Sequence, residues 1–156
     1  MKLEISSDHE AIITQTFAAP RRIVFDAFLH PAQLRRWYGA APLTLTVCEA
    51  DLRVGGTWRQ VLRAPDGSEH GFTGVYQVID PPARIVRSER YEALGPGHEI
   101  VATMTFHEHD AHTTLSLALA YPSQADRDGH LASGMADGMR ASFARLADLL
   151  PGLAAA

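Results

Sequence analysis

The sequence has little cysteine and no long apolar run. Cys48 is the one cysteine in 156 residues, so no disulfide can form within the chain, and a lone thiol is typical of a reducing compartment. No stretch approaches the roughly 20 consecutive apolar residues of a membrane-spanning helix, and the N-terminus has no apolar core of a secretory signal. We therefore expect a soluble, cytoplasmic protein that does not bind membranes.

The chain also lacks an excess of positive charge and the common catalytic motifs. Its formal net charge is −4 and its arginines are scattered among acidic neighbours, which excludes a basic surface for nucleic acid. It contains no GxSxG, P-loop or GxGxxG motif, so we predict no catalytic residue, cofactor or metal. With 46% hydrophobic and 21% charged residues, the composition is that of a globular protein, and the length predicts one domain over residues 1–156.

The order of hydrophobic patterns predicts an α+β fold. Residues 11–17 are rich in β-branched side chains and predict a first strand. Pro20 and Pro31 suit the first turn of a helix, so two short helices are expected before Gly39. Alternating runs separated by turn residues then predict a six-strand antiparallel meander, with strands at 43–51, 57–63, 71–79, 84–91, 99–107 and 113–121.

The last stretch predicts one long helix from Ser123 to Leu150. Ser123 and Asp126 form an acidic variant of the capping box, and Pro151 with Gly152 is expected to end the helix. Its apolar residues recur three or four positions apart and form one face: Leu131, Met135, Met139, Phe143, Leu146 and Leu150. Three glycines weaken its N-terminal half, so we expect the curved sheet to hold the helix in place.

Several phrases in this order resemble one known superfamily. They are FAAPRRIVFDAFLHPAQLRRWYG, EADLRVGGTWR, DGSEHGFTGVYQVIDPPARIV, HTTLSLALAYPS and RDGHLASGMADGMRASFARLADLL. Together they resemble the START-like helix-grip (SRPBCC) superfamily, in the branch similar to the C-terminal domain of the activator of the ninety-kilodalton heat-shock protein ATPase. The resemblance implies about seven curved strands around a C-terminal helix, with a cavity between sheet and helix and the short helices at its mouth. Related proteins bind lipids, hormones or polyketides, and some are cyclases.

The middle strands suggest where a ligand would bind. Polar and aromatic side chains alternate on both faces of residues 57–63 and 84–91, which is typical of a pocket with an apolar body and a few polar anchors. Strands solvated on one side explain the same pattern. The predicted apolar lining is Phe28, Trp37, Trp58, Tyr76, Met104, Met135, Met139 and Phe143, and the candidate polar anchors are Arg59, Arg87 and Glu89.

Four other features have a structural and a functional interpretation. Trp37 and Tyr38 either pack in the core or form a gate at the pocket mouth. Glu49 and Asp51 suit acid–base chemistry, but an Asp–Arg pair beside the turn explains them more simply. The histidines between 107 and 112 resemble metal ligands, and a hairpin tip explains them more simply. Cys48 is expected to be a small buried residue.

Three functions remain from the sequence. The first is binding of an apolar or amphipathic small molecule in the cavity. The second, implied by the resemblance alone, is an interaction with a chaperone whose ATPase it stimulates, consistent with a role in the stress response. The third is a cyclase- or hydrolase-type enzyme using Glu49, Arg59 or Glu89. A monomer or a homodimer is compatible with the pattern.

Overall fold

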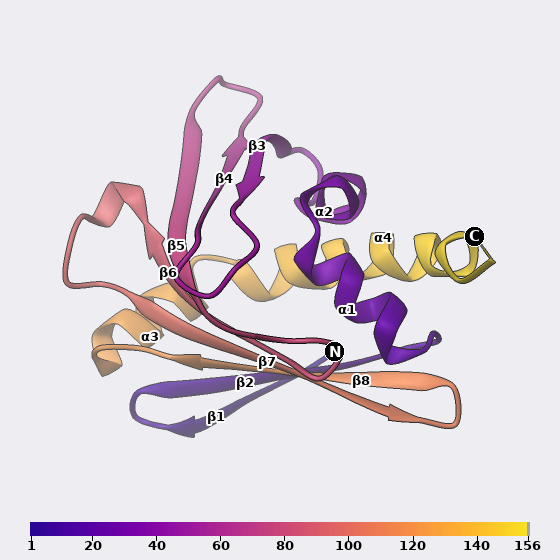
Figure 1. Ribbon diagram of the computed structural model, residues 1–156. Helices are drawn as coiled ribbons and strands as arrows, with labels where there is room; N and C mark the ends of the chain where they lie inside the picture. Colours follow the sequence, from indigo (N-terminus) through magenta and orange to yellow (C-terminus); the bar gives the residue numbers. More distant parts are fainter. Residues whose placement is uncertain (156) are drawn as a thin grey trace.

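The computed structural model describes residues 1–155 and shows one curved antiparallel sheet that holds a pair of C-terminal helices (Figure 1). The α+β helix-grip fold expected from the sequence is confirmed. The elements are β1 (Lys2–Ser7), β2 (Glu10–Phe17), α1 (Arg21–Leu29), α2 (Pro31–Trp37), β3 (Thr44–Ala50), β4 (Thr57–Arg63), β5 (Glu69–Asp80), β6 (Arg84–Tyr91), a short 3₁₀ turn η1 (Glu92–Leu94), β7 (Ile100–His109), β8 (His112–Ala120), α3 (Gln124–Ala132) and α4 (Met135–Ala155).

The sheet has eight strands in the order β1-β2-β8-β7-β6-β5-β4-β3. Strands β3 to β8 form the expected meander, and β2 returns to pair with β8, with Ile13 opposite Leu117. The sequence analysis did not predict β1, which pairs with β2 at the sheet edge. Most side chains of β1 are exposed, so the strand has no buried face to give a clear alternation.

The short helices begin where the prolines predicted. Pro20 is the N-cap of α1, and Pro31 occupies the first turn of α2, positions where proline's missing N–H has no helical partner to lose. Ala27, on α1, accepts a hydrogen bond at 3.0 Å from the indole nitrogen of Trp37 on α2. This bond ties the two helices together, and Figure 1 shows both of them beside α4.

The prediction of one unbroken helix from Ser123 to Leu150 was wrong at its middle and its end. The chain forms α3 and then α4, with Gly134 between them at a φ of +83°, a conformation that favours glycine. Pro151 lies inside α4 instead of ending it, and the helix continues to Ala155. The start was predicted correctly, because Ser123 Oγ accepts a hydrogen bond from the backbone N–H of Asp126.

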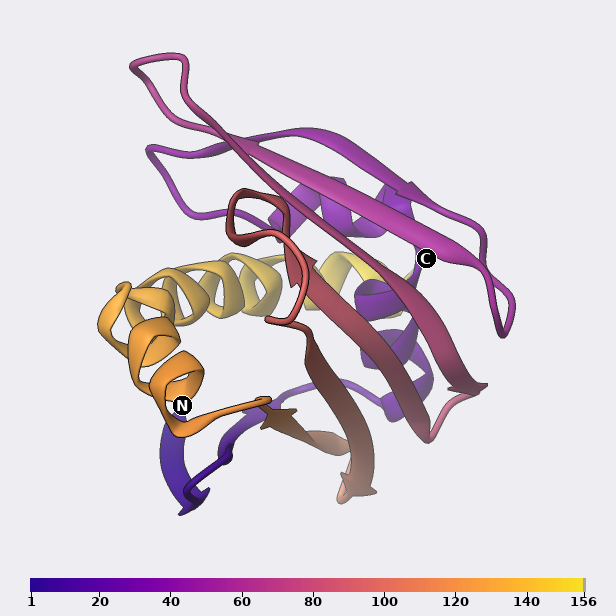
Figure 2. The same ribbon diagram turned by 90° about the vertical axis from the view of Figure 1, so that its left-hand side faces the viewer.

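The hydrophobic core lies between the concave face of the sheet and α1, α2 and α4. Figure 2 shows the sheet bending around these helices, with α3 closing one end. We define the inner face as the side of the sheet that carries Ile13, Leu117, Met104, Ile85 and Tyr76, all of them buried in this core. No helix within residues 1–155 is both long enough and apolar enough to cross a membrane.

Candidate functional site

Phe143, near the middle of α4, packs in a buried aromatic cluster. Phe143 meets Phe17 edge-to-face with ring centroids 5.5 Å apart, and it meets Phe28 at 5.9 Å. Trp37 completes the cluster at 4.8 Å from Phe28. All four rings are buried, so the predicted lining residues Phe28, Trp37 and Phe143 serve here as core.

The N-terminal half of α4 is less completely covered. Phe143, Leu146 and Leu150 are buried, whereas Met135 and Met139 on the same helical face are only half-buried. Both methionines contact the core, so they face the sheet and not bulk water. Their side chains have several rotatable bonds and can repack around a partner of variable shape.

Trp58 forms the floor of the inner face opposite this part of the helix. Its indole N–H donates a hydrogen bond of 3.1 Å to the backbone oxygen of Ser88, which lies two strands away. The ring reaches Ser88 because Gly74, on the strand between them, has no side chain, and a Cβ there would lie 2.7 Å from the indole nitrogen. The guanidinium of Arg87 lies over the Trp58 ring, 3.9 Å from its centroid, in a cation–π contact.

Polar groups without partners lie on the same face. The pairing of Tyr76 with Arg87 and of Cys48 with Gln60 places Arg87 and Gln60 on the inner face, because paired residues of adjacent strands share a side. Within residues 1–155, Arg87 Nε and Gln60 Oε1 are buried and have no hydrogen-bond partner. Gln60 is only 3% exposed, so its oxygen has an unmet demand for a donor.

Tyr38 and Glu89 extend this group, and we call Tyr38, Gln60, Arg87 and Glu89 the inner polar cluster. The pKa of Tyr38 is raised to about 12, mainly by burial and also by the negative charge of Glu89, while Arg87 opposes the shift. Glu89 follows Arg87 by two residues on β6, so both side chains point to the same side. Tyr38 therefore lies near Arg87 and Glu89, and Gln60 shares the inner face with these two residues on the other side of Trp58.

Tyr121 and His130 lie at the α3 end of the cluster. Tyr121 Oη and His130 Nδ1 are 2.6 Å apart. Burial lowers the pKa of His130, while the charge of Glu89 opposes this shift. Burial also raises the pKa of Tyr121, again with a contribution from Glu89, so Glu89 influences groups on both sides of the inner face.

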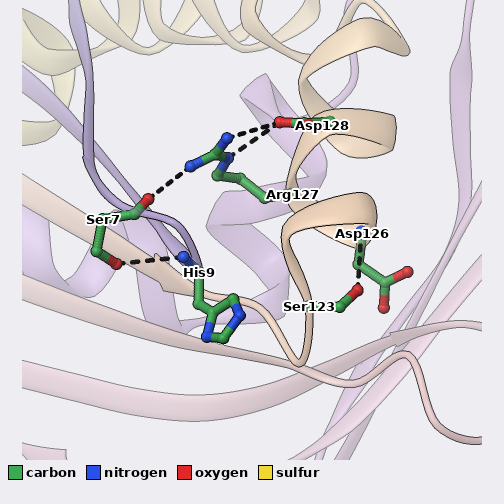
Figure 3. A network of polar contacts seen from close by, with 6 residues as sticks. All are labelled: Ser7, His9, Ser123, Asp126, Arg127 and Asp128. Atoms are coloured by element: carbon green, nitrogen blue, oxygen red, sulfur yellow. Dashed lines mark hydrogen bonds and ion pairs between the residues drawn. The ribbon is translucent and has the colours of Figure 1, made fainter.

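Helix α3 is held in place by polar contacts to the β1–β2 turn and to the loop before β7. Arg127 is 7% exposed and donates from Nη1 to the backbone oxygen of Ser7 at 2.6 Å, as Figure 3 shows. Its Nε and Nη2 bind Asp128. His98 pairs with Asp126 at 2.9 Å. These contacts fix the end of the inner face that the methionines leave partly open.

Two of the candidate acid–base groups lie outside the inner face. Arg59, predicted as a polar anchor, is exposed and forms a two-bond ion pair with Glu92, so that prediction was wrong; its position alternates with Trp58 and points to the opposite side. Glu49, opposite Arg59 on β3, is exposed as well. Asp51 forms the expected pair with Arg53 at 2.7 Å. Of the groups named for an enzyme, only Glu89 lies on the inner face.

The remaining features have structural explanations. Met104 and Tyr76, both predicted as lining, are buried, and Met104 lies opposite Ile85 in the core. Cys48 is buried, as expected. His107 and His109 are exposed beside the β7–β8 turn. In residues 1–155, no three His, Cys, Asp or Glu side chains converge in a way that could hold a metal ion.

Two surface depressions stand out within residues 1–155, and neither is the cavity between sheet and long helix that the resemblance implies. One, of about 320 Å³, is lined by Pro42, Thr44, Thr46, Arg63, Ala64 and Pro65. The other, of about 220 Å³, lies around Thr73, Val75 and Arg90. Neither depression is lined by a residue of α4.

Sequence reasoning found part of the inner polar cluster. It selected Arg87 and Glu89 from the mixed pattern of β6, and Trp58 from β4. It missed Gln60 as an anchor, although Gln60 shares a face with Trp58 and alternation within β4 could have indicated it. No local signal pairs Tyr121 with His130, since the two residues come together only when α3 folds back over β8.

The curved sheet, the helix pair and the short helices at one end define a START-like helix-grip protein. A family model, activator of Hsp90 ATPase homolog 1-like protein, matches residues 18–151, and the chain belongs to this family. The expectation from the sequence is thus confirmed.

Solved structures agree with this assignment. A protein from Rhodobacter sphaeroides is 29% identical, with a TM-score of 0.90 over 97% of this chain and 99% of its own. A protein from Chromobacterium violaceum is 26% identical, with a TM-score of 0.78 over 92% and 98%. An HSP90 activator from Plasmodium falciparum is 24% identical, with a TM-score of 0.56 over 72% of each chain, and shares the fold.

A curated relative from Schizosaccharomyces pombe is described as uncharacterized. It is 29% identical over 105 residues, which is 67% of this chain. The match spans 27% of the relative's length, so the chain corresponds to about a quarter of that protein.

Proposed function

We propose that this protein binds an apolar or amphipathic small molecule on the inner face of the sheet, beneath the N-terminal half of α4. The observation that carries the proposal is the contrast along one helical face. Phe143, Leu146 and Leu150 are buried in the core, whereas Met135 and Met139 are half-buried. The sheet also carries two buried polar atoms, Gln60 Oε1 and Arg87 Nε, that have no partner within residues 1–155. A region designed only for stability would pair or remove such groups.

The binding mode is derived from the same contacts. The two methionines move aside to admit the ligand between sheet and helix. Arg87 then meets the polar end of the ligand. Neither of the two depressions described above lies under α4, so ligand entry requires a change in these side chains. Gly134 at the α3–α4 joint gives the backbone freedom to move with them.

The test is thermal unfolding with and without naphthol, a small aromatic alcohol. A ligand at about 100 times its Kd stabilises a folded protein by roughly 2.7 kcal/mol, which raises Tm by several degrees. Met139→Trp fills the space and is expected to abolish the shift. Ala141→Trp adds the same side chain at an exposed position of α4 and is expected to retain it. An equal rise in Tm in both variants places binding elsewhere. If neither naphthol nor related aromatics raise the Tm of the wild type, the proposal is overturned.

A second candidate function is stimulation of an Hsp90-type ATPase. The family match over residues 18–151 and the similarity to the Plasmodium falciparum HSP90 activator support it. The experiment is to measure the ATPase rate of purified Hsp90 with increasing amounts of this chain. A rate that rises and saturates supports this role, and an unchanged rate at high excess removes it.

A further inference from the structure

The inner polar cluster presents a donor and an acceptor, and each lacks a partner. The guanidinium carbon of Arg87 lies 3.9 Å from the centroid of the Trp58 ring, and Nε has no acceptor within residues 1–155. Gln60 has the opposite need, since its buried Oε1 requires an N–H or O–H. A ligand that satisfies both groups must itself accept one hydrogen bond and donate another.

Arg87 and Glu89 carry opposite charges on this face. Glu89 lies two residues after Arg87 on the same side of β6, so an anion that approaches Arg87 also approaches a carboxylate. A cation that approaches Glu89 meets Arg87 in the same way. The pKa of Tyr38, raised mainly by burial, responds to both charges, because Glu89 raises it further and Arg87 lowers it. An uncharged polar group is repelled by neither Glu89 nor Arg87 and does not bring a new charge into the buried site.

We infer that the ligand carries an uncharged head with one hydrogen-bond acceptor and one hydroxyl or N–H, attached to a flat apolar body. The acceptor, such as a ketone or amide oxygen, binds Arg87, and the hydroxyl or N–H donates to Gln60. The body lies beneath Met135 and Met139. This inference rests on the proposed function and narrows it to one class of ligand.

Calorimetric titration with four compounds that share one body tests the inference. Naphthalene has neither group, acetylnaphthalene has the acceptor, hydroxylated acetylnaphthalene has both, and naphthoate has a negative charge. We expect the hydroxylated ketone to bind about tenfold tighter than acetylnaphthalene and naphthoate to bind at least about tenfold more weakly than the hydroxylated ketone, as buried hydrogen bonds and unbalanced charge require.

Variants assign the two ends of the head. Gln60→Leu is expected to abolish the tighter binding of hydroxylated acetylnaphthalene over acetylnaphthalene. Arg87→Met is expected to abolish the tighter binding of acetylnaphthalene over naphthalene. Gln77→Leu and Arg84→Met, at exposed positions of β5 and β6, are the matched controls. Both are expected to leave these two differences in affinity unchanged.

The possible failures are distinct. If naphthoate binds most tightly, or if Gln60→Leu still binds the hydroxylated ketone more tightly than acetylnaphthalene, the inference of an uncharged head bound by Gln60 is wrong. If all four compounds bind equally, the proposed function stands and this inference fails. If none binds, the proposed function fails with it.

Discussion

The indole N–H of Trp58 donates a hydrogen bond to the backbone oxygen of Ser88 at 3.1 Å, across the full width of β5. Such a contact between strands that are not neighbours requires a gap in the strand between them. Gly74 supplies that gap, and the buried indole then forms the surface on which Arg87 lies. Glycine at this one position therefore shapes the inner face.

Gly74→Ala is expected to destabilise the protein strongly. Its Cβ would lie 1.8 Å from the backbone oxygen of Ser88, and neither strand can yield without loss of ladder hydrogen bonds. We expect a loss of about 3 kcal/mol or more in the free energy of unfolding, measured by urea denaturation. Gly129→Ala, on α3 with open space around it, is the control, and a similar loss in both variants would contradict the role of the gap.

Two glycines near the start of α4 are expected to respond in opposite directions. Gly134 has a φ of +83°, so Gly134→Ala forces a strained backbone and costs about 1 kcal/mol. Gly138 lies inside α4 with nothing near its missing Cβ, so Gly138→Ala stabilises by roughly 1 kcal/mol through helix propensity. Chemical denaturation measures the change in the free energy of unfolding for both variants. A gain in stability from Gly134→Ala would contradict the strained backbone at this position and favour the single continuous helix predicted from the sequence.

Acidification is expected to weaken the protein through His130. Burial holds its pKa below the unfolded value of about 6.5, so below that value the unfolded chain binds the additional proton and the folded chain resists it. The contribution of His130 is therefore fully present above about pH 6.5 and is lost as the pH falls toward the folded pKa. Protonation also makes both ring nitrogens of His130 donors, so the Tyr121 hydroxyl can then only accept from Nδ1.

The measurement for His130 is Tm between about pH 7 and pH 5. His130→Asn keeps an acceptor for Tyr121 but cannot titrate, so its Tm is expected to fall less over this range than that of the wild type. His9→Asn, at an exposed position, is expected to retain the wild-type slope. Identical slopes for wild type and His130→Asn would show that another group is responsible.

Arg127 is expected to hold α3 against the β1–β2 turn. Arg127→Met leaves the backbone oxygen of Ser7 without this donor and costs roughly 1–3 kcal/mol in the free energy of unfolding. Arg140→Met, which removes an exposed arginine from α4, is expected to change stability by less than about 0.5 kcal/mol. Faster amide exchange in β1 and α3 of the Arg127 variant is the second readout, and unchanged exchange would contradict the link.

Local patterns were sufficient for most elements of the fold. Alternation of apolar residues predicted the meander strands, and Pro20, Pro31 and Ser123 marked helix starts that the structure confirms. The failures have physical causes. Strand β1 has almost no buried face to create a pattern, and the break at Gly134 and the continuation through Pro151 depend on how α3 and α4 pack.

The candidate site depended more on tertiary contacts. Alternation in β6 marked Arg87 and Glu89, but the same reasoning on β4 also led to Arg59, because a sequence does not tell which side of a strand faces the helix when both sides are polar and aromatic. Tyr121 and His130 are nine residues apart and pair only through the turn into α3.

The amino-acid sequence alone determined the α+β class, the order of nearly all elements and the family resemblance, since each depends on short-range periodicity and turn chemistry. Only the three-dimensional packing decided which polar groups meet on the inner face, where the C-terminal helix breaks and which half of α4 is dry. Those features depend on contacts between strands and helices far apart in the chain, and no local pattern encodes such contacts.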